Sequence, residues 1–344
     1  MDAIRTEREG VNLVNPKNMK PIILILRQAV LLAAIASLAS CEKATNATSE
    51  SSPQRLVIFS QCNNAEPYRA AQNAEMKKLW GAYPDVKVVI MDAQQDNSKQ
   101  ISQIETAIRE KPSLLIVAPN ERAPLTQVMG EAMGAGIPVI CLERDIAEPN
   151  YTTWIRADNR EIGRMVGEYV VEKLKAKNGD VKGRIVELAG LKGVEAETNR
   201  REGADDVWKQ YPGIEIVTDV VADWLQSKAK DRMTEVLSAV PQIDVVYGRN
   251  DPMAVGAYLA AKEKNREKEM IFVGVDGLSG DSGGLEKVKD GVLAATFIYP
   301  LCVNKAVEVG NKILRDPKFV PEKVYTIPSK MVTTENVEAV LQQK

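Results

Sequence analysis

The stretch DVVYGRNDPM at residues 244–253 and the stretch IFVGVDG at residues 271–277 decide the fold class. Asp244–Tyr247 and Met270–Val275 are short apolar runs without alternation, which is typical of parallel strands covered on both faces. The residues between them predict a helix that ends near Asn265. Because a helix between two parallel strands makes a right-handed βαβ unit, the sequence predicts an α/β fold.

Polar residues follow both of these strands where they end. Arg249 and Asn250 come after the first strand, and Asp276 ends the second. In open parallel sheets ligands bind at this edge, because loops and helix N-termini converge there. An alternative is that residues 250–252 only cap the following helix and that Asp276-Gly277 is only a turn.

The same arrangement recurs along the chain. Five strands alternate with helices up to Ile155, and the pattern begins again at Asp158. The strands expected before this break are residues 56–60, 86–91, 114–118, 138–142 and 152–155. The strands expected after it are residues 184–188, 214–221, 244–247, 270–275, 293–298 and 324–327. Two copies of one architecture predict two doubly wound parallel-sheet lobes.

Length and composition limit the classes of function. A chain of 344 residues is longer than one ordinary hydrophobic core supports, which also favours two lobes. The formal net charge of -2 gives no general attraction to nucleic acid. The chain contains no histidine, which excludes Ser-His-Asp and Cys-His nucleophiles and removes the commonest zinc ligand. No carboxylate pair accompanies a nucleophile or base, so we expect no enzyme, no cofactor and no metal site.

The four cysteines are Cys41, Cys62, Cys141 and Cys302, without a CxxC pair or the spacing of metal ligands. Cys141 lies in an apolar run and is interpreted as a small buried hydrophobic residue. A disulfide between Cys62 and Cys141 is conceivable, but nothing in the spacing demands it.

The N-terminal segment has the layout of a secretory signal. Positive charges after Met19 precede the short apolar run Ala29–Ala39, and small residues then lead to Cys41. The run is too short for a comfortable membrane span. We expect a signal peptide at residues 1–40, with Met19 as an alternative start of the chain. The alternative is an uncleaved signal anchor in which Cys41 has no role.

The sequence Leu38-Ala-Ser-Cys41 resembles a bacterial lipobox. The resemblance implies cleavage before Cys41 and lipidation of its thiol and new amino group, which anchors a protein at a membrane. Residues 41–54 are rich in Ser, Thr, Asn and Ala and predict a flexible tether. We therefore expect a lipoprotein of the periplasm or cell surface.

Several segments closely resemble bacterial periplasmic sugar-binding proteins of the ribose and galactose type. They are GIPVICLER at 136–144, ADN at 157–159, Arg200 with Glu202-Gly203, Asn250-Asp251 with Met253-Ala254, and VGVDG at 273–277. The resemblance covers residues 56–332. It implies a first lobe of residues 55–157 plus 300–328 and a second lobe of residues 158–299 plus 329–344. It also implies a three-strand hinge near Ala157, Tyr299 and Pro328.

The resemblance also implies which residues contact the ligand in a cleft between the lobes. They are Asn63, Asn64, Tyr68, Glu143 and Arg144 in the first lobe, Arg200, Trp224, Asn250 and Asp276 in the second, and Tyr299 at the crossing. Sugar hydroxyls accept and donate hydrogen bonds, which planar Arg, Asp and Asn groups satisfy in pairs, while aromatic rings cover the C–H faces. Alternatives are that Trp224 is a core residue and that Arg144 and Arg200 form surface ion pairs.

The chain departs from the family pattern at several positions. Glu143 stands where the family usually has Asp, Tyr299 stands where some members have Gln, and residues 65–67 replace an aromatic-bearing turn. Arg69 and Arg249 add positive charge near the expected cleft. The ligand is therefore open among a monosaccharide, a polyol and a sugar acid.

The expected function is capture of such a ligand and its delivery to the permease of an ABC transporter by a monomeric protein that binds no nucleic acid. An alternative is a sensor domain that reports to a membrane receptor or kinase. A sugar-responsive repressor with the same core needs an N-terminal helix-turn-helix, where this chain has a secretion signal.

Overall fold

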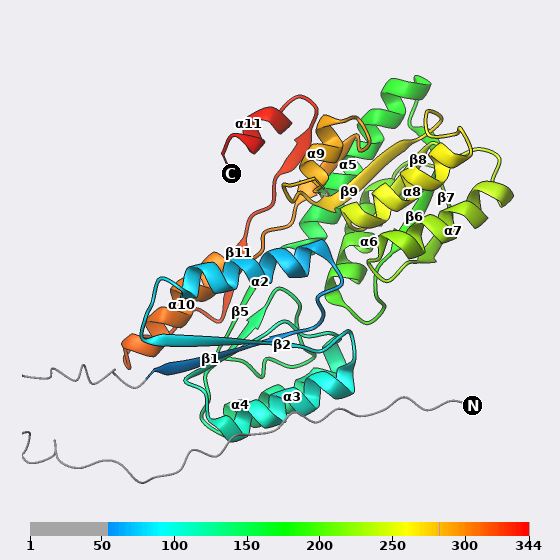
Figure 1. The fold of residues 1–344 in the computed structure, drawn as a ribbon. Coiled ribbons are helices and arrows are strands. Elements are labelled where there is room, and N and C mark those ends of the chain that lie inside the picture. Colours follow the sequence, from blue (N-terminus) through cyan, green and yellow to red (C-terminus); the bar gives the residue numbers. More distant parts are fainter. Residues whose placement is uncertain (1–53, 282, 344) are drawn as a thin grey trace, which may run out of the picture. The chain divides into compact units, whose positions relative to one another are not determined.

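The computed structural model describes residues 54–281 and 283–343. Within them the chain forms two six-stranded sheets, each covered by helices on both faces (Figure 1). The predicted signal peptide, the lipidation site Cys41 and residues 41–53 of the tether lie outside the described residues.

The first sheet is entirely parallel, with the strand order β11-β5-β4-β3-β1-β2. Its strands are β1 (Arg55–Gln61), β2 (Val86–Asp92), β3 (Leu114–Val117), β4 (Val139–Leu142), β5 (Thr153–Ala157) and β11 (Val324–Ile327). One face packs against α2 (Pro67–Trp80) and α10 (Val303–Arg315), and the other against α3 (Asn97–Glu110) and α4 (Arg122–Gly134). Successive residues of β1 point to opposite faces, so Val57 and Phe59 join the first pair of helices and Ile58 the second.

The second sheet has the order β12-β10-β9-β8-β6-β7 and is parallel except for β12. Its strands are β6 (Lys182–Ala189), β7 (Gly213–Val221), β8 (Val245–Gly248), β9 (Ile271–Asp276), β10 (Ala295–Ile298) and β12 (Met331–Thr333). Helices α5 (Asn159–Asn178) and α6 (Glu195–Trp208) cover one face. The other face carries α7 (Gln226–Ala239), α8 (Asp251–Glu263), α9 (Gly284–Lys289) and α11 (Val337–Leu341).

Local sequence signals explain where several helices begin. Asp96, Asp158 and Asn250 precede α3, α5 and α8, and each side chain accepts a hydrogen bond from a backbone N–H of the first turn. Pro67 and Pro252 lie in the first turns of α2 and α8, where a missing N–H costs nothing. These caps fix the helix N-termini at the carboxyl ends of the preceding strands.

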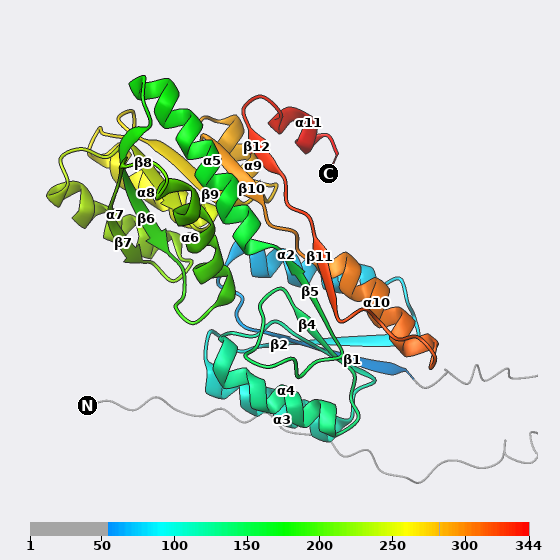
Figure 2. The ribbon, with the colours of Figure 1, turned by 180° about the vertical axis from the view of Figure 1, so that it is seen from behind.

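The chain passes between the sheets three times, after Ala157, at Tyr299 and at Pro328. Figure 2 shows the second and third crossings side by side, in orange and red. Ile298 N donates to Lys330 O at 2.8 Å, which ties these two crossings together. The predicted three-strand hinge between two doubly wound lobes is confirmed, whereas the limits of the lobes, 55–157 with 300–328 and 158–299 with 329–344, stay predictions.

Three short elements were not expected from the sequence, namely β12, α9 and α11. Helix α9 begins at Gly284, at the end of a glycine-rich segment. Strand β12 has three residues and pairs antiparallel with β10. Elements this short show no periodicity, because they depend on tertiary packing rather than on local pattern.

Candidate functional site

Side chains from both lobes meet in a narrow cleft at the carboxyl ends of the two sheets. The residues that line it are Glu66, Tyr68, Arg69, Glu143, Arg144, Ala196, Arg200, Trp224, Asn250, Asp276 and Tyr299. The free space between them is about 20 Å³, which is room for about one water molecule. A sugar ring is larger, so its entry requires the walls to move apart.

The fold explains why these side chains converge. The first wall comes from the first turn of α2 and from the residues that follow β4. The second wall comes from α6, from the loop after β7, from the N-cap of α8 and from the end of β9. All of these positions lie at the carboxyl edge of a parallel sheet or on the helix that follows it, where α/β folds bind ligands.

Eight of the ten predicted contact residues line the cleft, and Asn63 and Asn64 do not. Asn63 is buried behind the lining and donates through Nδ2 to Glu66 Oε1 at 2.7 Å. Asn64 is exposed and accepts a hydrogen bond from Asn73 at 2.5 Å. The loop between β1 and α2 therefore presents Glu66 to the cleft in place of the two asparagines.

The structure adds Glu66, Arg69 and Ala196 to the predicted lining. Glu66 and Arg69 lie at the start of the helix that follows β1. This position at the carboxyl edge of the sheet is the sequence signal from which they could have been predicted. Arg249 does not line the cleft, because its side chain is buried behind it.

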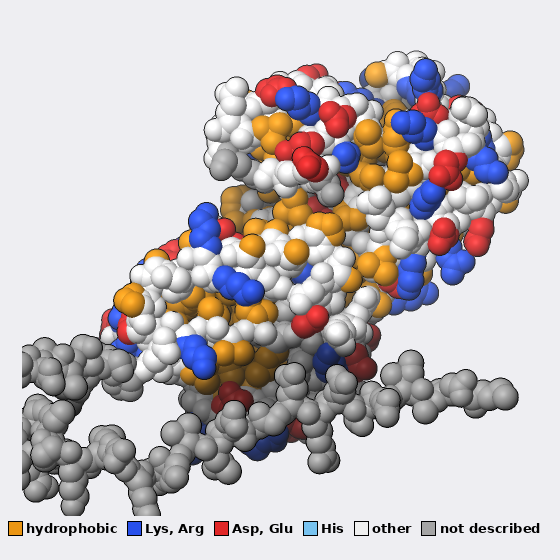
Figure 3. Space-filling model, viewed as in Figure 1, with side chains coloured by type: hydrophobic (Ala, Val, Ile, Leu, Met, Phe, Trp, Pro, Cys, Tyr) orange, Lys and Arg blue, Asp and Glu red, His pale blue; other side chains and the backbone are white. Residues whose placement is uncertain are grey.

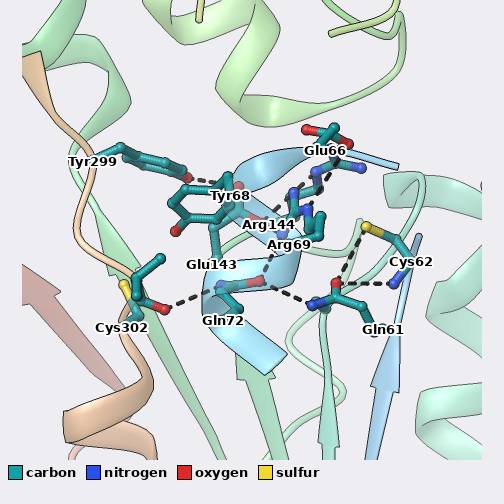
Figure 4. A network of polar contacts seen from close by, with 12 residues as sticks. Gln61, Cys62, Glu66, Tyr68, Arg69, Gln72, Glu143, Arg144, Tyr299 and Cys302 are labelled. Carbon is teal, nitrogen blue, oxygen red and sulfur yellow. Dashed lines mark hydrogen bonds and ion pairs between the residues drawn. The ribbon is translucent and has the colours of Figure 1, made fainter. Parts of the chain in front are cut away.

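The first wall is a network of ion pairs (Figure 4). Arg69 Nη1 donates to Glu143 Oε2 at 2.6 Å and to Gln72 Oε1 at 3.0 Å. Arg144 lies 3.8 Å from Glu143 and 4.0 Å from Glu66, while its Nε has no hydrogen-bond partner among the described residues. Burial raises the pKa of Glu143, but the charges of Arg69 and Arg144 outweigh burial and the net pKa is lowered. Glu143 is therefore an anionic hydrogen-bond acceptor at neutral pH.

The second wall centres on Arg200 and Asp276. Arg200 donates through Nε to Asn159 Oδ1 at 3.0 Å and through Nη1 to the Arg249 carbonyl at 2.6 Å. Burial, and then the neighbouring Asp251 carboxylate, raise the pKa of Asp276 well above its usual value. Both side chains are almost fully buried, so Arg200 does not form the surface ion pair that was the alternative.

Tyr299 joins the two walls. Its hydroxyl donates to Glu143 Oε1 at 2.8 Å, and Asn159 Nδ2 lies 3.3 Å from the same hydroxyl (Figure 4 shows Tyr299 beside Tyr68). The ring stacks on Tyr68 with centroids 5.1 Å apart, and the Arg200 guanidinium lies 4.2 Å from the ring centroid. One side chain at the hinge thus contacts charged groups of both lobes.

Three lining residues hold a backbone conformation that non-glycine residues rarely adopt. The φ angles are 66° for Glu143, 69° for Trp224 and 140° for Asp276. Such conformations cost about 1–3 kcal/mol each and persist where the surrounding structure fixes them, which is common at functional sites. Their concentration in the cleft supports a site that is held in place for a ligand.

Trp224 and Asn250 each have a structural role besides lining the cleft. Trp224 belongs to a hydrophobic cluster and is 4% exposed, so the core interpretation is partly correct. Asn250 caps α8 through Oδ1, as the capping alternative required, and donates through Nδ2 to the Trp224 carbonyl at 3.0 Å. Trp224 Nε1 has no hydrogen-bond partner among the described residues.

A larger groove of about 1010 Å³ lies beside the cleft. It is lined by α2 and α10, the loop after β9 and the second crossing, with apolar residues that include Leu278, Ile298 and Leu301. Figure 3 shows apolar side chains in the hollow between the two halves. Asp276 and Tyr299 line both the groove and the cleft, so these two residues form the partition between them.

The described part of the chain holds no metal cluster, no disulfide and no membrane-spanning helix. No group of three or more Cys, Asp or Glu side chains there is arranged to hold a metal ion. Cys62, Cys141 and Cys302 are buried free thiols, so the conceivable Cys62–Cys141 disulfide is not formed. Residues 54–281 and 283–343 include no helix with the length and apolar character needed to cross a membrane.

A sequence model of the periplasmic binding protein domain matches residues 57–313. The chain belongs to the periplasmic binding protein family. The family consists of solute-binding proteins, and membership implies an extracytoplasmic location. The predicted resemblance to the ribose type is confirmed by a curated relative.

That relative of the binding protein is a ribose import binding protein of Bacillus subtilis (strain 168). It is 30% identical over 250 residues, which cover 72% of this chain and 77% of the relative.

Solved structures agree with the fold of this periplasmic binding protein. The fructose-binding periplasmic domain of a hybrid two-component system is 39% identical, with a TM-score of 0.79, covering 84% of this chain and 94% of that domain. An ABC transporter solute-binding protein from Bacillus halodurans C-125 with bound myo-inositol is 26% identical, with a TM-score of 0.78, covering 86% and 100%. The binding protein therefore has the type I fold of two lobes.

Proposed function

We propose that the protein captures a monosaccharide or a related polyol in the cleft between its lobes and delivers it to the permease of an ABC transporter. The observation that carries the proposal is the convergence of charged and aromatic side chains from both lobes on one small space. Two donors that have no hydrogen-bond partner among the described residues, Arg144 Nε and Trp224 Nε1, belong to lining residues from opposite walls. A ligand with several oxygens would satisfy them together, and only the closed arrangement brings them together.

The charges of the lining favour a neutral ligand. Three arginines, Arg69, Arg144 and Arg200, face three carboxyl groups, Glu66, Glu143 and Asp276. A charged ligand would upset this balance in a space that excludes water. A sugar acid is the second candidate, because the raised pKa of Asp276 allows that group to hold a proton.

A thermal-shift screen tests the ligand class. The panel contains D-ribose, D-fructose, myo-inositol, xylitol and D-galacturonate, and a ligand should raise the melting temperature with the logarithm of its excess over Kd. We predict that Arg144→Ala and Asp276→Ala each abolish the shift while the unliganded protein stays folded. Glu172→Ala, at an exposed position of α5, is the control and should keep the full shift. Two unchanged shifts in the cleft variants would show that the site is elsewhere.

A second candidate function is sensing, in which closure of the lobes reports to a membrane receptor or kinase. The similarity to the periplasmic domain of a hybrid two-component system favours it. Deletion of the gene separates the two functions. Lost uptake of the sugar supports transport, and lost induction with normal uptake supports sensing.

We also propose that Cys41 carries a lipid anchor, which rests on the lipobox sequence alone. Labelling with a tagged fatty acid should be lost in Cys41→Ala, and the variant should leave the membrane fraction. A variant that stays in the membrane without label would support the uncleaved signal anchor instead.

A further inference from the structure

A fully buried arginine, Arg249, lies behind the cleft in the second lobe, directly after β8. Its guanidinium contacts three carboxylates. Nη2 lies 3.1 Å from Glu187 Oε1, Nη1 lies 3.2 Å from Asp219 Oδ1, and Nη1 also donates to Glu197 Oε1. Glu187 and Glu197 are themselves buried, so the cluster is shielded from solvent except at Asp219.

One hydrogen bond connects this cluster to a side chain that lines the cleft, and a second connects it to the glycine that packs against Trp224. The Arg249 carbonyl accepts a hydrogen bond from Arg200 Nη1 at 2.6 Å. Glu197 Oε2 accepts a hydrogen bond from Gly190 N at 2.7 Å. Gly190 in turn supports Trp224, because a Cβ on Gly190 would lie only 2.2 Å from atoms of the indole ring. A shift of the cluster would therefore reach both Arg200 and Trp224.

The negative charge around Arg249 exceeds what one guanidinium can balance. The titratable groups around Arg249 and Glu187 come from three neighbouring elements. They are Asp219 of β7, Tyr247 of β8, and Glu197 and Asp205 of α6. Burial raises the pKa of Glu187 to about 7; Arg249 opposes the rise, and Asp219 and Asp205 add to it. Burial also raises the pKa of Glu197. Near neutral pH, Glu187 is therefore a mixture of the protonated and the ionised form.

We infer that the buried cluster of Arg249, Glu187 and Glu197 positions Arg200 and Trp224 for the ligand, and that loss of a proton from Glu187 weakens ligand binding. When Glu187 releases its proton to water, a second uncompensated carboxylate forms next to Asp219. The repulsion is relieved if Arg249 and Glu197 shift, which displaces the carbonyl and the amide that hold the two cleft side chains. The inference rests on the proposed solute-binding function.

A measurement without any sugar tests the positioning step. Tryptophan fluorescence of the unliganded protein is followed between pH 5.5 and 8.5, a range in which no histidine titrates because the chain contains none. We expect a transition with a midpoint near pH 7 that is absent in Glu187→Gln. Trp224→Phe should also remove it, which assigns the signal to this indole. Glu172→Gln, a substitution of an exposed glutamate on α5, should leave it unchanged.

Affinity gives the second test. Calorimetric titrations with D-fructose, D-ribose and myo-inositol are made at pH 6 and pH 8. Because protonated Glu187 favours the binding arrangement, Kd for the bound probe should be about 3- to 10-fold weaker at pH 8 in the wild type. In Glu187→Gln, Kd should differ by less than about twofold between the two pH values.

The two tests separate the two hypotheses. If none of the three sugars binds at either pH, the proposed ligand class is wrong, and the fluorescence transition still decides the inference. A wild-type fluorescence signal without a transition, or a transition that persists in Glu187→Gln, would overturn it. Equal pH dependence of Kd in the wild type and in Glu187→Gln would do the same.

Discussion

Tyr299 stands between an arginine of one lobe and a tyrosine of the other, with its hydroxyl on a buried carboxylate. Tyr299 stands where some members of the family were expected to carry Gln, and its side chain lines the cleft. It also pairs with Glu143, whose second oxygen is already bound to Arg69. The identity of this residue therefore affects both the stability of the closed cleft and the size of ligand that it admits.

Tyr299→Phe removes the hydroxyl and keeps the ring. We expect the free energy of unfolding to fall by about 1.5–3 kcal/mol, because a buried carboxylate loses one hydrogen bond. Urea unfolding of the unliganded protein measures the change.

Tyr258→Phe is the matched control for this substitution. Tyr258 is half-buried on α8, and its hydroxyl makes no hydrogen bond with the other described residues. It should change stability by less than about 0.5 kcal/mol. Equal losses in the two variants would contradict the role given to the Tyr299 hydroxyl.

The site residues that could be predicted are those placed by strand ends. Asp276 is the last residue of β9 and Glu143 directly follows β4, so the strand pattern locates them to within a residue. Asn63 and Asn64 do not line the cleft, because the loop after β1 has no such constraint and its turn buries one asparagine and exposes the other. The role of Arg249 could not be predicted either, since its carboxylate partners are 30 or more positions away in the sequence.

The loops that follow β6 and β7 are packed against each other through a glycine and an indole. Gly190 begins the first of them, and Trp224 lies on it in a strained conformation with φ of 69°. Asn250, from the N-terminus of α8, holds the Trp224 carbonyl. Three elements that are distant in sequence thus set the position of one aromatic side chain.

Gly190→Ala places a methyl group where the indole now lies. The ring must move, so we expect stability to fall by about 1–3 kcal/mol and sugar affinity to fall by about tenfold or more. Thermal unfolding and titration with the sugar found in the screen measure the two effects.

Gly134→Ala at the end of α4 is the control, because a Cβ there meets no atom within 4 Å. Replacing a helical glycine without a clash should be neutral or slightly stabilising and should leave affinity unchanged. Unaltered affinity in Gly190→Ala would show that the loop contact does not position Trp224.

Most helices and strands could be predicted from sequence, whereas β12, α9 and α11 could not. Strands such as β3, β4 and β8 are four-residue runs in which every residue is buried, so composition alone marks them. Strand β12 has only one fully buried residue, Val332, and exists because β10 offers it an edge. That partner is remote in sequence, which no local pattern reveals.

The molecule as a whole has no histidine, so its pH dependence near neutrality comes from carboxyl groups with raised pKa. Glu187 has a folded-state pKa of about 7, above its ordinary value of 4.5. A raised pKa means that the folded state binds the proton more tightly than the unfolded chain does. Its stabilising contribution is complete below about pH 4.5 and is lost as the pH rises through about 7.

Glu187→Gln should therefore match the wild type in stability near pH 4.5 and exceed it by about 2–4 kcal/mol at pH 8. Denaturant unfolding at both pH values measures the gap, and Glu172→Gln is the control with no gap at either pH. A gap that is constant with pH would mean that Glu187 is ionised throughout this range.

The last strand of each sheet, β11 and β12, begins only after residue 323 of the 344-residue chain. A ribosome that has made everything before that point has produced two sheets in which β5 and β10 still lack an outer neighbour. Open strand edges pair readily with other polypeptides. Neither sheet of the nascent protein can therefore be completed before β11 and β12 have been synthesised.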